Sequence, residues 1–257
     1  MVIDSHCHLD LLAEHFDITQ LLEDAKKAGV SHVMTIATDV GNFDNIINYT
    51  DTYSNVYAAI GVHPLNVTNQ IIEYDTLVDA LSHPKAIATG ETGLDYYKNQ
   101  NEKADQIKSL EVHIRASQEL DIPIVIHTRA ADDDTIDILK SHYKERPFRG
   151  VIHCFTATER LAMEMLDIGF YISASGIATF KNTIDIQNTL KKVPLSRLLV
   201  ETDAPYLAPT PYRGKTNKPE YVMETAKYLA NLRDEDFIAF CEATTQNFYT
   251  LFDKGAA

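Results

Sequence analysis

Six side chains that can bind metal ions each stand at or just after the end of a short segment rich in β-branched residues. They are His6, His8, Glu91, His127, His153 and Asp203. A single histidine at such a place is commonly structural. Six such residues are hard to assign to packing, because buried ionisable groups are costly unless they are paired or bound to metal. Imidazole and carboxylate donors suit Zn²⁺, Mn²⁺ or Mg²⁺. The sequence therefore predicts a metal site.

The number of donors favours two ions over one. A single catalytic zinc needs three protein ligands and a water, whereas this chain offers four imidazoles and two carboxylates. Two divalent ions that share a carboxylate can hold a hydroxide between them. Glu91 is the best placed bridge, because its segment lies between the other ligand groups along the chain. We expect two divalent ions per chain.

Strand alternation assigns the neighbours of these ligands. Residues i and i+2 of a strand face the same side, so His6 and His8 point inward and Cys7 points towards the helices, which excludes Cys7 as a ligand. Asp4 is also expected to face inward. It either orients a ligand histidine or fills the floor of the site with its hydrogen bonds satisfied.

The same rule extends to two later segments. It places Arg129 on the face of His127, which predicts that Arg129 lines the pocket, and Glu201 on the face of Asp203, where it would support a ligand. It also turns Cys154 away from the site.

Two further features could contact a substrate. His63, after the third of these segments, is either a substrate contact or a structural histidine before Pro64. The stretch 204–219 holds four prolines together with Arg213, Lys215 and Lys218 and no acidic residue between these cations. Barrel enzymes often bind phosphate with loops after strands seven and eight, so this loop predicts a phosphate cradle; the alternative is a solvated charged loop.

These residues need a parallel sheet to bring them together. Helix-period segments alternate with the β-rich ones, and Gly29 and Gly169 follow two of these helices, as helix C-caps require. The eight predicted strands are Val2–His6, Val33–Thr38, Tyr57–Val62, Ala86–Glu91, Pro123–His127, Val151–Phe155, Phe170–Ser173 and Leu198–Asp203. Strand and helix alternating throughout predict an α/β fold, a single (β/α)₈ TIM barrel.

No linker divides the chain, so we expect one domain over residues 1–257. An additional C-terminal helix, Asp234 to Phe252, follows the eighth unit. Its apolar residues suggest that it packs against the outside of the barrel.

Composition limits the partners. The 257 residues carry 23 Lys+Arg against 37 Asp+Glu, a net charge of −14, which argues against a broad basic surface for nucleic acid or membrane. A phosphate-bearing substrate must then be held locally.

The three cysteines form no close pair, and the start lacks the pattern of a secretory signal. We therefore expect a cytoplasmic protein without membrane contact. The sequence leaves its oligomeric state open.

Several motifs, in order, resemble the TatD family of metal-dependent deoxyribonucleases, within the amidohydrolase-type barrels. The match covers nearly the whole chain. It comprises Asp4-Ser5-His6-Cys7-His8-Leu9-Asp10, Gly61-Val62-His63-Pro64, Gly90-Glu91-Thr92-Gly93-Leu94-Asp95-Tyr96, His127-Thr128-Arg129, His153-Cys154-Phe155, Thr179-Phe180-Lys181-Asn182, Glu201-Thr202-Asp203-Ala204-Pro205-Tyr206 and Arg213-Gly214-Lys215. Ala130 and Ala157 depart from the residues usual in the family, but neither is a ligand.

The resemblance implies a complete site. One ion would take His6, His8 and Asp203, the other His127 and His153, with Glu91 between them. It implies hydrolysis of DNA phosphodiesters by a metal-activated water, with Mg²⁺ as the metal in use and single strands degraded from the 3′ end.

Roles for the other residues follow from this hypothesis. Glu91 and Asp203 would be catalytic. The substrate contacts would be His63, Arg129, Lys181, Arg213 and Lys215. The competing hypothesis is an amidohydrolase that cleaves a C–N or ester bond of a small molecule, since that chemistry uses the same barrel and nearly the same ligands.

Overall fold

Eight parallel strands stand side by side in the order of the sequence. The computed structural model describes residues 1–69, 71–98 and 102–256. Each strand pairs with the next, and a bridge between Cys7 and Ala204 links the first strand to the segment after the last. The strands are β1 (Val2–Cys7), β2 (Val30–Ile36), β3 (Val56–Ile60), β4 (Ala86–Asp95), β5 (Ile124–Arg129), β6 (Gly150–Ile152), β7 (Tyr171–Ala174) and β8 (Leu198–Val200). The predicted (β/α)₈ barrel is confirmed.

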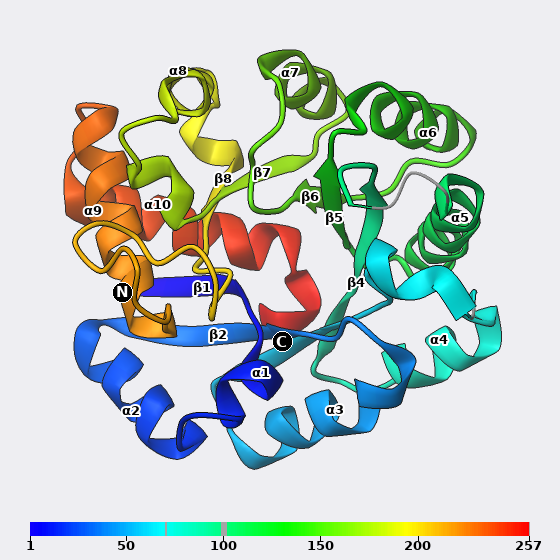
Figure 1. Ribbon diagram of the computed structural model, residues 1–257, viewed down its shortest axis with the longest axis horizontal. Helices are drawn as coiled ribbons and strands as arrows, with labels where there is room; N and C mark the ends of the chain where they lie inside the picture. The colour runs from blue at the N-terminus through cyan, green and yellow to red at the C-terminus, as the bar shows by residue number, and fades with distance from the viewer. Residues whose placement is uncertain (70, 99–101, 257) are drawn as a thin grey trace.

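The helices surround the strands as an outer layer (Figure 1). They are α1 (Leu9–Ala13), α2 (Ile18–Ala28), α3 (Phe43–Thr52), α4 (Tyr74–Leu81), α5 (Lys103–Leu120), α6 (Asp132–Glu145), α7 (Glu159–Asp167), α8 (Ile184–Lys192), α9 (Val222–Leu232) and α10 (Phe237–Leu251). Gly29 ends α2 in the left-handed conformation with φ 103°, as the sequence predicts. Within the described ranges, none of the helices has the length and apolar character needed to cross a membrane.

Strand β4 runs four residues beyond its predicted end. Its pairing with β5 shifts register between Thr89 and Thr92. Gly93 has φ 141°, and a Cβ there would lie 2.0 Å from the His127 carbonyl oxygen, so only glycine allows this close approach of the two strands. Such irregularities re-aim a neighbouring side chain, here Glu91.

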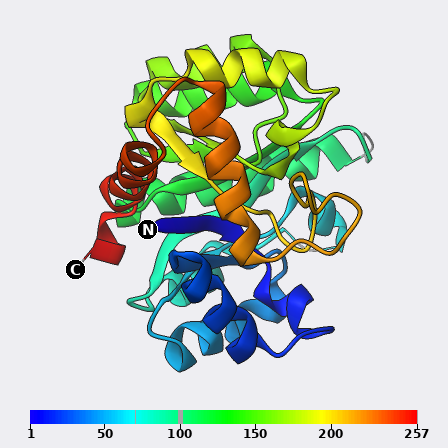
Figure 2. The same ribbon diagram turned by 90° about the vertical axis from the view of Figure 1, so that its left-hand side faces the viewer.

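Helix α10 closes the amino-terminal end of the barrel. Its Phe248 and Leu251 join a buried cluster with Val151 and Leu199 of strands β6 and β8. The helix lies on the side of the barrel that carries the two termini (Figure 2). Its first half packs as the sequence suggested, because Phe240 and Cys241 belong to the buried cluster between the strands and the outer helices. The helix begins at Phe237, three residues later than expected, because Asp236, and not Asp234, caps it.

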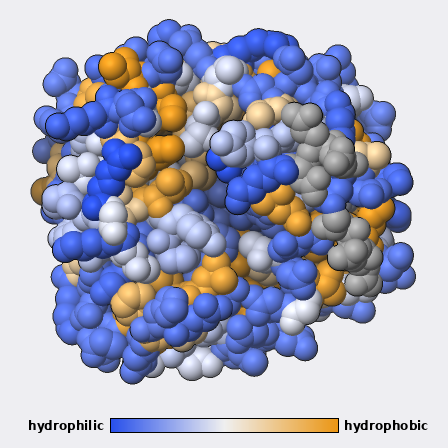
Figure 3. Space-filling model, viewed as in Figure 1, coloured by the Kyte–Doolittle hydropathy of each residue, from blue (hydrophilic) through white to orange (hydrophobic). Residues whose placement is uncertain are grey.

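The opposite end of the barrel is open. Figure 2 shows the loop that follows β8 on the side away from the termini, so Figure 1 looks onto the carboxyl ends of the strands. That face is hollowed near its centre, and both hydrophilic and hydrophobic residues border the hollow (Figure 3). Active sites of TIM barrels occupy this end.

Candidate metal centre

Glu91 of β4 lies at the centre of a group of imidazoles. Its Oε1 is 2.7 Å from His153 Nε2 and 2.9 Å from His127 Nδ1, and its Oε2 is 3.4 Å from His6 Nε2. The fourth ring, of His63, brings Nε2 to 3.5 Å from Oε1. One carboxylate thus contacts side chains that lie in β1 and β5 or shortly after β3 and β6.

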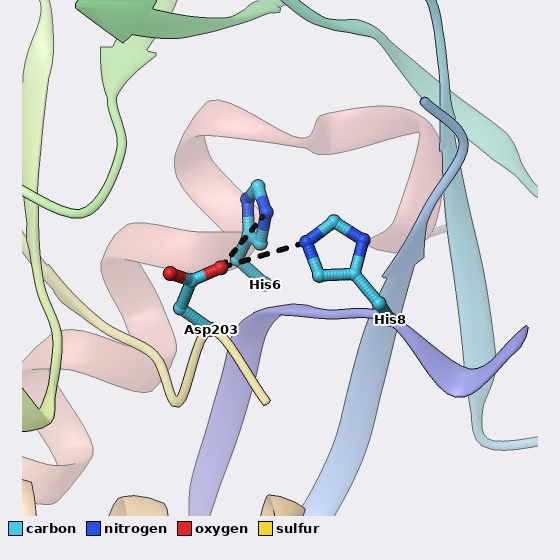
Figure 4. Close-up of side chains that lie close together, drawn as sticks. All are labelled: His6, His8 and Asp203. Carbon is cyan, nitrogen blue, oxygen red and sulfur yellow. Dashed lines mark ion pairs between the residues drawn. The ribbon is translucent and has the colours of Figure 1, made fainter. Parts of the chain in front are cut away.

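A second carboxylate lies near His6 of β1 and His8, which follows this strand. Asp203 Oδ1 lies 3.5 Å from His8 Nε2 and 3.8 Å from His6 Nε2 (Figure 4). The His6 ring also stacks on the His153 ring, with centroids 4.0 Å apart. His6 therefore joins the group around Asp203 to the group around Glu91.

Strands β6 and β8 end earlier than predicted, so strand alternation does not position the residues that follow them. Cys154 has φ 43° and Asp203 has φ 57°, both in the left-handed region that only glycine enters without cost. Such conformations persist where the surrounding structure imposes them, commonly at functional sites. The Cys154 thiol lies 3.2 Å from Ser175 Oγ and not against a predicted metal ligand.

Glu201 is in contact with the site, as predicted, through one ligand. Its Oε1 lies 3.3 Å from His153 Nδ1 and accepts a hydrogen bond from the Cys154 backbone at 2.7 Å. A carboxylate on the far nitrogen of an imidazole holds the ring orientation and raises its basicity. Glu201 thus orients His153 towards Glu91.

Asp4 takes the second of its two predicted roles, that of a buried carboxylate with its hydrogen bonds satisfied. Its carboxylate accepts hydrogen bonds from Thr202, from the backbone N–H at 2.8 Å and from the hydroxyl at 2.6 Å, and it touches no imidazole. Asp4 ties β1 to the segment after β8. Burial raises its pKa to about 8 against the lowering effect of Thr202.

The electrostatics favour ionised carboxylates and, for one histidine, a neutral ring. Burial alone would raise the pKa of Glu91, but His153 and His63 hold it well below its usual range. Burial likewise opposes ionisation of Asp203, and the hydrogen bond to His8 lowers its pKa. Burial lowers the pKa of His63 to about 4. Burial opposes protonation of His153, but Glu91 and Glu201 raise its pKa well above the usual range, and Asp203 likewise raises the pKa of His8. The carboxylates therefore stabilise positive charge within the site, as they would stabilise a bound cation.

Several buried imidazole nitrogens of the site have no hydrogen-bond partner among the described residues. These are His6 Nδ1 and Nε2 and His8 Nδ1. Buried polar atoms without partners are uncommon and call for an explanation such as a bound ion. The donors also cluster closely enough for ions. One group is His6, His8 and Asp203, and others are His6, His153 and Glu201, and His63, Glu91 and His127. This donor set fits divalent metal ions.

The grouping differs in one respect from the predicted pairing of ligands. His127 and His153 both approach Glu91 Oε1, but the compact group that contains His127 includes His63 and not His153. His63 thus lies within the cluster. Its Nδ1 accepts a hydrogen bond from the Leu65 backbone, which directs Nε2 towards Glu91.

Asp95 is a site residue that the sequence analysis missed. Its Oδ2 lies 3.3 Å from His127 Nε2, while the other nitrogen of that ring faces Glu91. Burial opposes its ionisation, but the hydrogen bond from His127 and others lower its pKa to about 2. Gln106 of α5 accepts from the Asp95 backbone N–H at 2.8 Å and so holds it in place. The signal was present: Asp95 is four residues after Glu91, on the same face of a longer strand.

Two of the predicted substrate contacts pair with aromatic rings. The Arg129 guanidinium lies 4.0 Å from the centroid of the Tyr97 ring, and that of Arg213 lies 4.1 Å from the Phe180 ring. Both arginines are exposed, and neither has a carboxylate partner among the described residues. Their charges remain available to an anion.

The lysines are less committed to the site. The Lys215 ammonium lies 5.8 Å from the Tyr212 ring, which itself stacks on Tyr221 at 3.9 Å. Lys181 is exposed and contacts neither the cluster nor any described carboxylate. The structure therefore brings Lys215 onto the aromatic part of the basic loop and leaves Lys181 on the surface.

A groove of about 1500 Å³ is lined by the segments after β5, β6 and β7 and by helices α6 to α8, and no residue of the cluster lines it. Arg129 lines it near His127. Its other cations are largely neutralised, for example Lys103 by Asp134 at 2.6 Å and Lys192 by Glu159 at 2.7 Å. The groove is larger than a single reacting group requires. Its surface is not continuously positive, because most of its cations pair with carboxylates.

An eight-stranded parallel barrel with imidazoles and carboxylates gathered at its carboxyl end is the architecture of barrel metal-dependent hydrolases. The family model described as TatD related DNase matches residues 3–253, so the chain belongs to the TatD family of metal-dependent hydrolases. The family resemblance seen in the motifs is confirmed.

Relatives with similar sequences cover the full length. The chain is 42% identical over 98% of its length to a metal-dependent hydrolase of Buchnera aphidicola, with 99% of that protein covered. It is 41% identical over its whole length to the metal-dependent hydrolase YcfH of Escherichia coli, with 97% covered. The crystal structure of YjjV, a TatD homologue from Escherichia coli, superposes with a TM-score of 0.91 at 30% identity and 98% coverage of both chains.

Proposed function

We propose that the protein hydrolyses phosphodiester bonds of DNA, preferring single strands and acting from the 3′ end, with Mg²⁺ as its metal in use. The observation that carries this proposal is the Glu91 carboxylate amid imidazoles in a chain that matches a DNase-related family over residues 3–253. Cations without carboxylate partners at the rim, Arg129 and Arg213, favour a substrate that bears phosphate. A cytoplasmic location remains a prediction from the cysteine content.

The residues divide between two divalent ions in this proposal. His6, His8 and Asp203 would hold one, His127 and His153 the other, and Glu91 would bridge them. When bound, such ions polarise the phosphodiester and lower the pKa of a water molecule. Glu201 and Asp95 each contact one of the histidines and would keep those rings in position.

The chain itself supplies proton transfer and phosphate binding. The Asp203 carboxylate is ionised and accessible from the mouth, so it can accept a proton from the attacking water. Arg129, Arg213 and Lys215 would neutralise the nonbridging oxygens, with Lys181 and His63 as further contacts. Three local cations meet the need for phosphate binding in a chain of net charge −14.

The test is direct. End-labelled single-stranded and double-stranded DNA and RNA are incubated with the protein in Mg²⁺, Mn²⁺ or EDTA, and the products are sized. We expect a ladder that shortens from the 3′ end of single-stranded DNA and no cleavage in EDTA. Absence of cleavage of every nucleic acid, with hydrolysis of amide or ester substrates in the same metals, would establish the amidohydrolase alternative instead.

A further inference from the structure

Two aromatic side chains stand out because solvent surrounds them. The chain has 13 Tyr, 10 Phe and no Trp. All 23 lie in the described ranges, and only Tyr97, 67% exposed, and Tyr206, 55% exposed, are exposed there. Scattered exposed apolar residues need no explanation. These two, however, are both adjacent in sequence and in space to residues of the metal centre.

Tyr97 belongs to the His127 side of the cluster. Its backbone N–H donates to Asp95 Oδ1 at 3.0 Å, and Asp95 Oδ2 in turn contacts His127. The Arg129 guanidinium lies 4.0 Å from the ring centroid and covers one face of the ring. With so much of the side chain exposed, the ring keeps surface for another planar group.

Tyr206 belongs to the His8 side. Its backbone N–H donates to the Asp203 carbonyl at 2.9 Å, and its own carbonyl accepts from Asn217 Nδ2 at 2.6 Å. Asn217 is fully buried and also binds the Thr202 carbonyl, so the backbone of Tyr206 is held firmly. The ring centroid lies 6.3 Å from that of His8.

The two rings flank the centre from opposite sides. Tyr97 follows β4 and Tyr206 follows β8, and in a ring of eight strands paired in sequence order the fourth and the eighth stand across from each other. Neither ring fills the core. A chain molecule that crosses the metal centre would therefore pass both rings.

We propose that Tyr97 and Tyr206 are stacking platforms for unpaired nucleobases on the two sides of the scissile phosphate. The inference rests on the proposed nuclease function and gives the substrate preference a structural cause. Aromatic rings beside cations are how proteins hold single strands, because every base has a π-face and an adjacent arginine reaches the phosphate. A base within a duplex is already stacked and paired, so it cannot use these rings.

The absence of tryptophan permits a direct binding measurement. Tyr97→Trp and Tyr206→Trp each introduce a single indole and keep an aromatic surface. The ligand is a hydrolysis-resistant phosphorothioate oligothymidylate, added with Mg²⁺. We expect it to quench the emission of both variants, whereas an abasic oligomer of equal length and a duplex should leave it unchanged. Ile238→Trp, at a 66% exposed position on α10, is the control and should show no change with any ligand.

Kinetics test whether stacking contributes to catalysis. Tyr97→Leu and Tyr206→Leu should each raise the KM for a single-stranded oligonucleotide by about 5- to 150-fold, the equivalent of one stacked base. Tyr→Phe at each position should retain the wild-type KM. A substrate with one abasic site at the stacked position should bind the wild type as weakly as the Leu variant, and the Leu variant should lose nothing further.

The outcomes separate this inference from the function on which it rests. Wild-type cleavage with an unchanged KM in both Leu variants, or quenching that the abasic oligomer reproduces, would overturn the stacking proposal and leave the nuclease assignment intact. Failure of the wild-type protein to cleave any nucleic acid would remove the nuclease assignment itself, and the stacking proposal with it.

Discussion

Glu91 contacts four imidazoles, and no other described carboxylate of the site does so. A bridging carboxylate neutralises part of the charge of two adjacent cations, whereas an amide carries no charge and one of its two terminal atoms is a donor. We expect Glu91→Gln to lose bound metal and activity together. Metal analysis after dialysis against Mn²⁺ measures the first and oligonucleotide cleavage the second.

The control for Glu91→Gln is the same replacement at Glu242, an exposed position on α10, which should change neither quantity. Circular dichroism should be native for both variants, since the site lies at the open end of the barrel. Retention of two ions by Glu91→Gln would show that Glu91 is not the bridge.

Replacement of Asp203 by asparagine should separate the effect on metal binding from the effect on proton transfer. Asparagine keeps the size and one oxygen donor but cannot accept a proton from water. Asp203→Asn should therefore retain much of its metal while kcat falls by about 10²- to 10⁴-fold, as for loss of a general base. Cleavage near the wild-type rate with metal in place would make His63 or Glu201 the next candidate for the base.

Among the elements, α5 is joined to the end of β3 by a buried neutral histidine. His113 donates from Nδ1 to the Ser109 carbonyl at 2.7 Å, and its Nε2 accepts from the Val62 backbone at 3.1 Å. The His113 side chain is fully buried. Burial lowers its pKa to about 4.

This link predicts a pH dependence of stability. Because the pKa of His113 is lower in the folded protein than in the unfolded chain, at 6.5, the unfolded chain binds the proton first as the pH falls. The contribution of His113 to the free energy of unfolding is fully present above about pH 6.5. It falls by up to about 3 kcal/mol as the pH is lowered to about 4. Urea unfolding of wild type and His113→Gln over this range measures it. Equal pH slopes would contradict the assignment.

The loop after β8 carries two cations that lie near aromatic rings. The Arg213 guanidinium lies over the Phe180 ring, and the Lys215 ammonium lies near the Tyr212 ring. If these cations hold phosphate, Arg213→Ala and Lys215→Ala should each raise the KM for oligonucleotides and reduce the slope of log KM against log salt by about 1. Lys144→Ala on α6, exposed like the others, should leave both unchanged. An unaltered slope in all three variants would exclude the phosphate cradle.

At the scale of the whole molecule, the site and the fold should be coupled through metal. Ligands come from strands around the entire ring, so metal bound only to the folded barrel must stabilise it. We expect one cooperative unfolding transition, two ions per chain, and a Tm raised by about 10–20 °C at metal concentrations near a hundred times the Kd of each site. Calorimetry with Mn²⁺ or EDTA measures this. Two separate transitions would contradict the single domain.

The sequence by itself determined the barrel and the identity of the clustered residues. Alternation of β-rich and helix-period segments is local, and parallel strands place their carboxyl ends at one face whatever the details of packing. His6, His127 and Glu91 therefore had to converge. The two-metal roles of these residues remain predictions.

Tertiary structure alone decided features that depend on distances between separate parts of the chain. The early ends of β6 and β8 broke the period of two on which residue-by-residue assignment relies, and the greater length of β4 brought Asp95 to His127. The place of α10 followed from which apolar surface was left uncovered at the amino-terminal end of the barrel. Tyr97 and Tyr206 could be recognised as flanking the site only after their exposure was known, because exposure is a property of the packed molecule.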